Sequence, residues 1–343
     1  MAETKIPYCD ATWDLTIGCR KRSPGCLNCW ATRTVHRLAR RGVRGYCGQE
    51  ESANGLPPYL LQTSLDGKNW KPMAYVNHLY HNVDKPLQWK SPRFIFVNSK
   101  GDLFDERVRF EFIGAAFDVM AQAKQHRYMI LTKEPGRLAE FIDWYSTDGR
   151  RRMGASWPDD FPHVILMTSV EDAEHLGRIK TLLRIPAVHY GVSFEPLLGQ
   201  LAPGLLRYLA DIQCSKCGWL GFGDNDTPDQ DGHWECPSCK ASVERCVYDY
   251  SAVHNFFGAD PRLDWVIIGG EKLIGGCAGR WAGEDPEAWW YEAAAMAKIL
   301  RHAGVATWMK QGPVRQDGRI VVSSDVTDFP TNCRIQQPQP WSP

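Results

Sequence analysis

The feature that most constrains this fold is a repeated alternation of short, almost wholly apolar runs with helical patterns. Apolar runs of about four to eight residues between turn signals are typical of buried strands. A first strand is predicted at residues 12–18 ("TWDLTIG"). The later apolar runs predict strands at residues 94–99, 128–133, 164–170, 188–194, 264–270 and 305–311.

Helical patterns lie between most of these runs. Residues 105–126 repeat apolar side chains at three- and four-residue steps, with acidic residues early and basic residues late, as a helix dipole favours. The same spacing predicts helices at residues 135–145 and 173–183, and residues 285–304 begin with Asp-Pro and end at a glycine. Apolar strands alternating with helices predict an α/β fold with a parallel sheet covered on both faces.

About seven strands favour a partial or complete (β/α) barrel. A doubly wound, Rossmann-like sheet is the alternative, because strand order cannot be deduced from the pattern. Residues 45–90 lack a clear period, and we expect an irregular excursion over the barrel mouth. The predicted domains are therefore a barrel formed by residues 1–211 and 248–343 and an inserted segment at residues 212–247.

The inserted segment contains two Cys-x2-Cys pairs separated by eighteen residues. Each pair forms a tight turn that directs two thiolates to one point, so two pairs supply a closed tetrahedral zinc site. The sequence predicts a zinc ribbon, with His233 as a less well-spaced substitute ligand and four unrelated thiols as the alternative. The predicted zinc ligands are Cys214, Cys217, Cys236 and Cys239.

A second cysteine cluster, Cys19, Cys26 and Cys29 with spacing C-x6-C-x2-C, follows the first predicted strand. In (β/α) barrels this end of the strands carries the active site. Three thiolates can hold a [4Fe–4S] cluster whose fourth iron is free to bind a small molecule, the arrangement that radical S-adenosylmethionine (SAM) enzymes use. The alternative, a zinc site, needs a fourth ligand, and the candidates lack a characteristic spacing: Cys9, Cys47 and His36.

The chain start has no basic region followed by an apolar run, and no apolar run approaches the roughly 20 residues of a membrane helix. These features predict a soluble, cytoplasmic protein without a membrane partner. In a reducing cytosol, clustered cysteines are more often metal ligands than disulfides. Formal net charge is zero, so overall charge identifies no partner.

Seven segments, including "TWDLTIGCRKRSPGCLNCWA", "PRFIFVNSKGDLFDERV", "GVSFEPLLG" and "LDWVIIGGE", occur in the order found in phage-associated three-Cys-motif proteins. The chain resembles that family, a divergent relative of radical SAM proteins, over residues 12–313 apart from the ribbon. The resemblance implies a radical-SAM-type barrel with a [4Fe–4S] cluster on the three cysteines. It also implies cleavage of SAM to a 5′-deoxyadenosyl radical, supported by an electron donor, that acts on an unknown substrate. Most radical SAM enzymes use C-x3-C-x2-C, so the loop here is longer.

The resemblance places further polar residues at the predicted strand ends. Ser99 and Asp102 occupy the place where radical SAM proteins bind the SAM amino group, and Glu195 is expected at the ribose hydroxyls. Glu271, in a Gly-Gly-Glu segment after a late strand, is a further cofactor-binding candidate. The alternatives are a helix-capping role for Asp102 and a charged network that only fills the barrel. The expected catalytic residues are Lys133, Glu171 and Lys310.

Residues 15–48 contain eight Arg or Lys residues and no acid. This asymmetry favours either steering of a polyanion or complementing an anionic cluster, and a solvated helix face is the alternative. Together with the ribbon and the phage association, it favours a nucleobase, nucleotide or nucleic-acid substrate. Two other functions stay open: a non-enzymatic nucleic-acid-binding protein with structural metals, and a cluster enzyme that uses its open iron as a Lewis acid.

Overall fold

The computed structural model describes residues 4–40, 76–149, 155–209 and 263–337, and parts of the ribbon segment. These parts are residues 212–213, 216–217, 220–221, 233–236, 238–240, 242–244 and 246–247. The chain divides into two compact units. The first comprises Met1–Glu171 and Ile185–Ser193, and the second comprises Asp172–Arg184 and Phe194–Pro343. Of the predicted excursion at 45–90, residues 45–75 lie outside the described residues.

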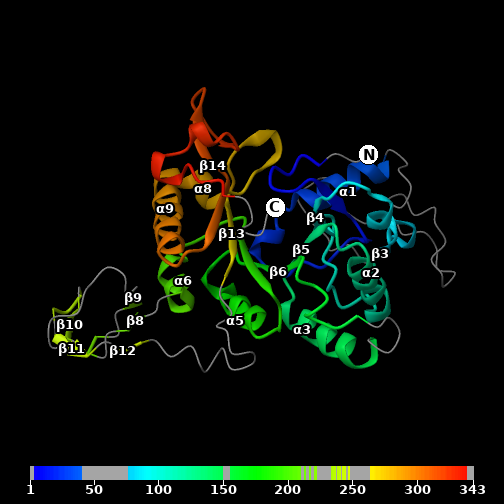
Figure 1. The fold of residues 1–343 in the computed structure, drawn as a ribbon. Helices are drawn as coiled ribbons and strands as arrows, with labels where there is room; N and C mark the ends of the chain where they lie inside the picture. Colours follow the sequence, from blue (N-terminus) through cyan, green and yellow to red (C-terminus); the bar gives the residue numbers. More distant parts are fainter. Residues whose placement is uncertain are drawn as a thin grey trace. The chain divides into compact units, whose positions relative to one another are not determined.

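The first unit is built on a parallel sheet whose strands follow the chain order. The strands are β1 (Ala11–Trp13), β4 (Phe94–Val97), β5 (Arg127–Thr132), β6 (Val164–Ser169) and β7 (His189–Phe194). Helices α2 (Phe110–Gln122) and α3 (Pro135–Trp144) follow β4 and β5 (Figure 1). Each crossover moves in the same direction along the sheet. This order lacks the reversal of a doubly wound sheet, so the Rossmann-like alternative is wrong for this unit.

The second unit contains β13 (Trp265–Gly269), which pairs in parallel with β14 (Ala306–Gln316), which in turn pairs antiparallel with β15 (Arg319–Ser323). Helix α9 (Pro286–His302) connects β13 to β14, and α6 (Ala202–Leu209) packs against α9 (Figure 1). With five strands in the first unit and three in the second, the predicted α/β fold with a mostly parallel sheet is confirmed. Among the described strands, no pairing closes a barrel.

The largest differences between predicted and observed bounds concern three elements. The first strand is split into β1 and β2 (Thr16–Ile17), and β2 pairs with β3 (Asn77–His78). The helix predicted from residue 105 begins at Phe110, because the backbone of residues 105–109 forms a loop around the Asp105 carboxylate. The last predicted strand continues past residue 311 to Gln316, where it forms a hairpin with β15.

The described residues of the ribbon segment form two small sheets. One joins β8 (Ile212–Gln213), β9 (Leu220–Gly221) and β12 (Cys246–Val247), and the other joins β10 (His233–Glu235) and β11 (Ser242–Glu244). Each of these pairings joins only two or three residues of each strand. Among the helices that the structure describes, none combines the length and apolar character needed to cross a membrane.

Candidate functional site

Residues 18–29, the cysteine loop, carry Cys19, Cys26 and Cys29. This loop is anchored to the end of β4 through Asn98. The buried Asn98 Oδ1 accepts hydrogen bonds from the backbone N–H groups of Leu15 (3.0 Å) and Thr16 (2.7 Å). Asn98 has a φ of +64°, a left-handed conformation that Asn tolerates better than most residues. These bonds end the first strand at Trp13 and turn the chain toward Cys19.

Gly101 lets the cysteine loop lie directly against the turn after β4. The Gly18 N–H donates to the Lys100 carbonyl at 3.2 Å, and a Cβ added at Gly101 would lie 2.8 Å from the Gly18 carbonyl oxygen. Such a distance is too short for any side chain, so a glycine is required at this close approach. The residue before Cys19 is therefore fixed by backbone contacts to the end of β4.

The three cysteines of the loop lie between β2 and helix α1 (Trp30–Arg40), which begins directly after Cys29. Cys26 is buried at the end of the short 3-10 helix η1 (Pro24–Cys26), while Cys19 and Cys29 are half-buried. The Cys26 N–H donates to the Ser23 carbonyl at 3.0 Å, and the Cys29 N–H donates to the Cys26 carbonyl at 3.4 Å. The loop thus makes two tight turns in succession, one ending at Cys26 and the next at Cys29.

The three thiols influence one another electrostatically. Burial raises the pKa of Cys19, and the neighbouring Cys29 thiol and Asp102 carboxylate raise it further. Burial also raises the pKa of Cys29. Burial has the same effect on Cys26, but the Lys133 ammonium and hydrogen bonds from nearby backbone N–H groups outweigh it and lower the pKa of that thiol. A bound metal cation would offset the repulsion between neighbouring thiolates, because it stabilises the thiolate form directly.

Glu171, at the end of β6, joins the cysteine loop to β5. Its carboxylate is fully buried and accepts a hydrogen bond from Ser23 Oγ at 2.8 Å, and it forms an ion pair with Lys133. Ser23 Oγ in turn lies 3.8 Å from Cys26 Sγ. A Cβ at Gly25 would lie 2.6 Å from Glu171 Cγ, so the loop backbone rests against this side chain. Two expected catalytic residues, Lys133 and Glu171, therefore lie together beside Cys26.

Asp102 links two segments of the first unit through hydrogen bonds to its carboxylate. Oδ1 accepts hydrogen bonds from Thr132 Oγ1 (2.7 Å) and the Phe104 N–H (3.0 Å), and Oδ2 accepts one from the Lys133 N–H (2.8 Å). Burial raises the pKa of this carboxyl despite the three donors. The structure thus uses Asp102 to join the turn after β4 to the end of β5. It is not the cap of α2, which begins after Arg109.

Ser99, the second residue predicted at this strand end, is paired with a residue that the sequence did not indicate. Its Oγ donates to Asp14 Oδ1 at 2.9 Å, and Lys100 forms an ion pair with the same carboxylate. Asp14 lies between β1 and β2, so this cluster also holds the start of the cysteine loop. In the structure Ser99 contributes to loop position.

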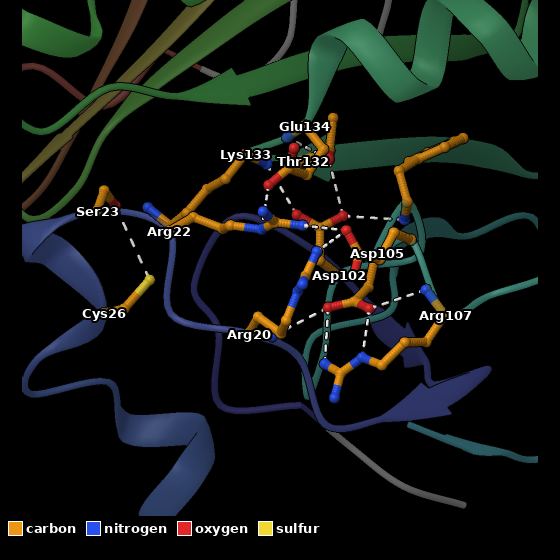
Figure 2. A network of polar contacts seen from close by, with 12 residues as sticks. Arg20, Arg22, Ser23, Cys26, Asp102, Asp105, Arg107, Thr132, Lys133 and Glu134 are labelled. Atoms are coloured by element: carbon orange, nitrogen blue, oxygen red, sulfur yellow. Dashed lines mark hydrogen bonds and ion pairs between the residues drawn. The ribbon is translucent and has the colours of Figure 1, made fainter. Parts of the chain in front are cut away.

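Two arginines of the cysteine loop are used in ion pairs with acids of the first unit, as Figure 2 shows. Arg20 pairs with Glu106, and Arg22 pairs with Glu134. The Arg20 N–H also donates to Asp105 Oδ2 at 3.0 Å. Burial opposes ionisation of Asp105, but hydrogen bonds from Arg107 prevail and lower the pKa of its carboxyl.

These pairs change the interpretation of the basic segment. Arg20 and Arg22 stabilise the loop against acids that lie more than 80 residues later, so they are not available as an open basic surface. Lys21 and Arg37 are exposed. Arg41 and Arg44 lie outside the described residues, as do the side chains of Arg33 and Arg40.

In the second unit, Glu195 follows β7 and is paired with residues of β14. Lys310 Nζ donates to Glu195 Oε1 in an ion pair, and Gln311 Nε2 lies 3.4 Å from the same oxygen. Gln311 Nε2 also donates to the Gly270 carbonyl at 2.7 Å. Two predicted site residues, Glu195 and Lys310, thus meet beside the Gly-Gly segment that follows β13.

Glu271, which comes directly after Gly270, is buried and pairs with Arg280. Arg280 Nε donates to Glu271 Oε2 at 2.8 Å, and Arg280 Nη2 pairs with Oε1. A Cβ at Gly279 would lie 2.4 Å from Glu271 Oε2, so the carboxylate is enclosed by backbone on one side. Glu271 therefore positions an arginine, and it does so with both carboxylate oxygens.

In the ribbon segment, Cys217, Cys236 and Cys239 form a group whose sulfur atoms all lie within 4.8 Å of one another. The Sγ atoms of Cys217 and Cys236 are 3.6 Å apart. The Lys240 N–H donates to the Cys236 carbonyl at 2.9 Å, and Lys240 has a φ of +56°, which closes the turn that holds Cys236 and Cys239. This group can hold a metal ion. Cys214, the predicted fourth ligand, lies outside the described residues.

Several functional contacts were not evident from the sequence. Ser23 lies within the cysteine loop, and Glu134 follows Lys133, so position beside predicted residues was the available signal. Arg280 lies nine residues after Glu271 and outside any motif. Its role depends on a loop that folds back, which residue spacing does not reveal.

The comparisons with known proteins identify a family without naming an activity. No curated protein and no solved structure matches the chain. The family described as "Protein of unknown function (DUF5131)" matches residues 3–321, which is nearly the whole chain. The chain therefore belongs to the DUF5131 family.

Proposed function

We propose that this protein is a radical SAM enzyme that binds a [4Fe–4S] cluster through Cys19, Cys26 and Cys29. The observation that carries the proposal is that the three thiols of one short loop lie near enough to influence one another's ionisation, which helps to raise the pKa of Cys19 and Cys29. Buried thiols that raise one another's pKa are poorly placed as free side chains. As ligands of a cationic metal group they would be stabilised as thiolates.

The spacing of the sulfur atoms supports a cluster over a single zinc ion. Tetrahedral Zn–S bonds of about 2.3 Å place sulfurs close together, as Cys217 and Cys236 are. Among the described residues, Cys19, Cys26 and Cys29 do not form a group with all ligand atoms within 4.8 Å of one another. A cube of four irons takes each thiolate at a different corner, so it fits a wider set of sulfurs.

When bound, such a cluster supplies one electron that cleaves SAM to methionine and a 5′-deoxyadenosyl radical, which removes a hydrogen atom from the substrate. The residues of the chain have supporting roles. Lys133 places a positive charge beside Cys26, and Glu171 holds both Lys133 and Ser23. Asp102 and Asp14 fix the turn after β4 against the cysteine loop. The electron comes from a separate donor.

The test is anaerobic purification, followed by counting of iron and zinc and an assay for 5′-deoxyadenosine after addition of SAM and dithionite. The proposal expects about four irons per chain, and loss of that iron in the Cys26→Ser/Cys29→Ser variant. Cys277→Ser, a change at a lone half-buried cysteine, is the matched control.

Two other outcomes identify the rival functions. Zinc in both cysteine groups and no iron after reconstitution would overturn the radical mechanism and favour a metal-stabilised binding protein. An iron cluster whose electron paramagnetic resonance (EPR) signal does not respond to SAM would point to an open iron that acts as a Lewis acid. Because some enzymes cleave SAM only with substrate present, the EPR response to SAM decides between these mechanisms when no deoxyadenosine forms.

We also propose that the ribbon segment holds one structural zinc ion on Cys214, Cys217, Cys236 and Cys239. The 3.6 Å separation of two sulfurs and the turn closed by Lys240 support it. Zinc released by a thiol-reactive reagent, counted against Cys239→Ser, tests this proposal separately from the iron content.

A further inference from the structure

The second unit contains an arginine that is fixed on one side and open on the other. Arg280 follows the loop after β13, and its guanidinium is bound by the buried carboxylate of Glu271 through Nε and Nη2. Its side chain retains 30 % of its exposure, whereas that of Glu271 retains 4 %. A guanidinium has five N–H groups, so two go to Glu271 and three are left for another acceptor.

No other partner of Arg280 is found among the residues that the structure describes. The N–H groups that Glu271 leaves unused, on a guanidinium that is held in place and partly exposed, match two oxygens of a carboxylate or phosphate. Fixing one edge beforehand also reduces the side-chain entropy that binding would cost.

The backbone around Arg280 is specialised for this placement. Arg280 has a φ of +22°, which residues with a side chain rarely adopt. Gly279, directly before it, is pressed against the Glu271 carboxylate, and the Gly279 N–H donates to the Glu271 carbonyl at 2.8 Å. Residues held in such conformations by surrounding contacts are concentrated at ligand sites.

Arg280 belongs to the edge of the sheet where ligands of open α/β folds bind. Glu271 follows the carboxyl end of β13, and Gly269 is in register with Gln311 of the parallel strand β14. Lys310, paired with Glu195, lies at the same edge of this unit. Carboxyl ends of parallel strands are the usual binding edge. Glu195 lies against Gly269 and Glu271 follows Gly270, so two carboxylates that each hold a cation meet this Gly-Gly segment.

We infer that Arg280 binds an oxyanion, a phosphate or carboxylate group of a ligand, and that Glu271 is the positioning residue for it. This inference is independent of the iron-binding cysteines. An ion pair with a purely structural role would explain the contact between Glu271 and Arg280, but it would not respond to added oxyanions. The distinction can be measured.

The experiment titrates the full chain, as purified and without SAM, with inorganic phosphate and separately with acetate, against sodium chloride at equal ionic strength. Binding is followed by calorimetry and by the Nε–H signal of Arg280 in a spectrum of 15N-arginine-labelled protein. We expect a saturable shift of that signal. Arg280→Gln should weaken binding at least tenfold, Arg280→Lys should weaken it less, and Arg319→Gln, at an exposed arginine on β15, should leave it unchanged.

Saturation by phosphate alone assigns a phosphate group to the ligand, and saturation by acetate assigns a carboxylate. The inference is overturned if neither oxyanion shifts the signal beyond the chloride control, or if Arg280→Gln binds as the unaltered chain does. Circular dichroism of each variant establishes that it is folded. Since the titration uses neither iron nor SAM, its failure is distinguishable from failure of the proposed radical chemistry.

Discussion

Ser23 Oγ donates a hydrogen bond to Glu171 Oε1 at 2.8 Å, across 148 residues of sequence. The bond links the loop that carries the three cysteines to the end of β6. Because Glu171 also pairs with Lys133 at the end of β5, one buried carboxylate sets the position of the loop and of the nearest cation.

Glu171→Gln removes the charge that Lys133 pairs with, while it keeps the size of the side chain. We expect a loss of about 2 kcal/mol in the free energy of unfolding, because the Lys133 ammonium loses the buried carboxylate with which it pairs. Urea denaturation measures the loss. Glu140→Gln, at a 69 % exposed side chain that lies 4.0 Å from Arg137, should change stability by less than about 0.5 kcal/mol. Equal effects of the two variants would contradict the central role of Glu171.

Gly101→Ala should displace the cysteine loop, because the added methyl group would lie 2.8 Å from the Gly18 carbonyl oxygen. The expected result is a lower content of bound iron after anaerobic reconstitution. Gly136→Ala is the matched control, since a Cβ at that position in α3 meets nothing within 4 Å. The control should retain its iron and gain stability of about 0.5–1 kcal/mol. Full iron content in Gly101→Ala would show that the close approach is not needed.

Asp118 should make stability depend on pH. Burial raises the pKa of its carboxyl to about 6, and Tyr145 donates to it at 3.0 Å. The folded chain therefore binds more protons than the unfolded chain between the unfolded value of 3.8 and about 6, so stability falls as pH rises through this window. Asp118→Asn should flatten the fall, as measured by urea denaturation at several pH values. Asp143→Asn, at an exposed carboxylate, should preserve it; an unchanged slope in Asp118→Asn would contradict the prediction.

Removal of metal from the ribbon segment should expose it to proteolysis. Short strand pairs such as β10–β11 have little apolar core, so a bound metal is expected to supply much of their folding energy. Cys239→Ser or treatment with a strong chelator should accelerate cleavage within residues 212–247, as mass spectrometry of limited digests would show. Cleavage at the same rate with and without metal would mean that the ribbon folds unaided.

The sequence predicted the alternating strands and helices because each of these elements has a local signature. The apolar runs that became β4, β6 and β13 are buried along their whole length, so composition alone identified them. Bounds were less predictable where side chains bind the backbone. The Asn98 side chain ends the first strand by accepting hydrogen bonds from the Leu15 and Thr16 N–H groups. The Asp105 carboxylate accepts hydrogen bonds from backbone N–H groups, and the residues beside it form a loop before α2.

The sequence by itself determined the cysteine groups and the polar residues at strand ends, because those depend on spacing and on where an apolar run stops. The tertiary structure decided which partners they have: Lys133 with Glu171, Glu195 with Lys310, and Glu271 with Arg280. It also converted Arg20 and Arg22 from a basic surface into ion pairs. The physical reason is that a charged side chain finds its counterion through space, and ion-pair partners up to 115 residues apart leave no mark in local sequence.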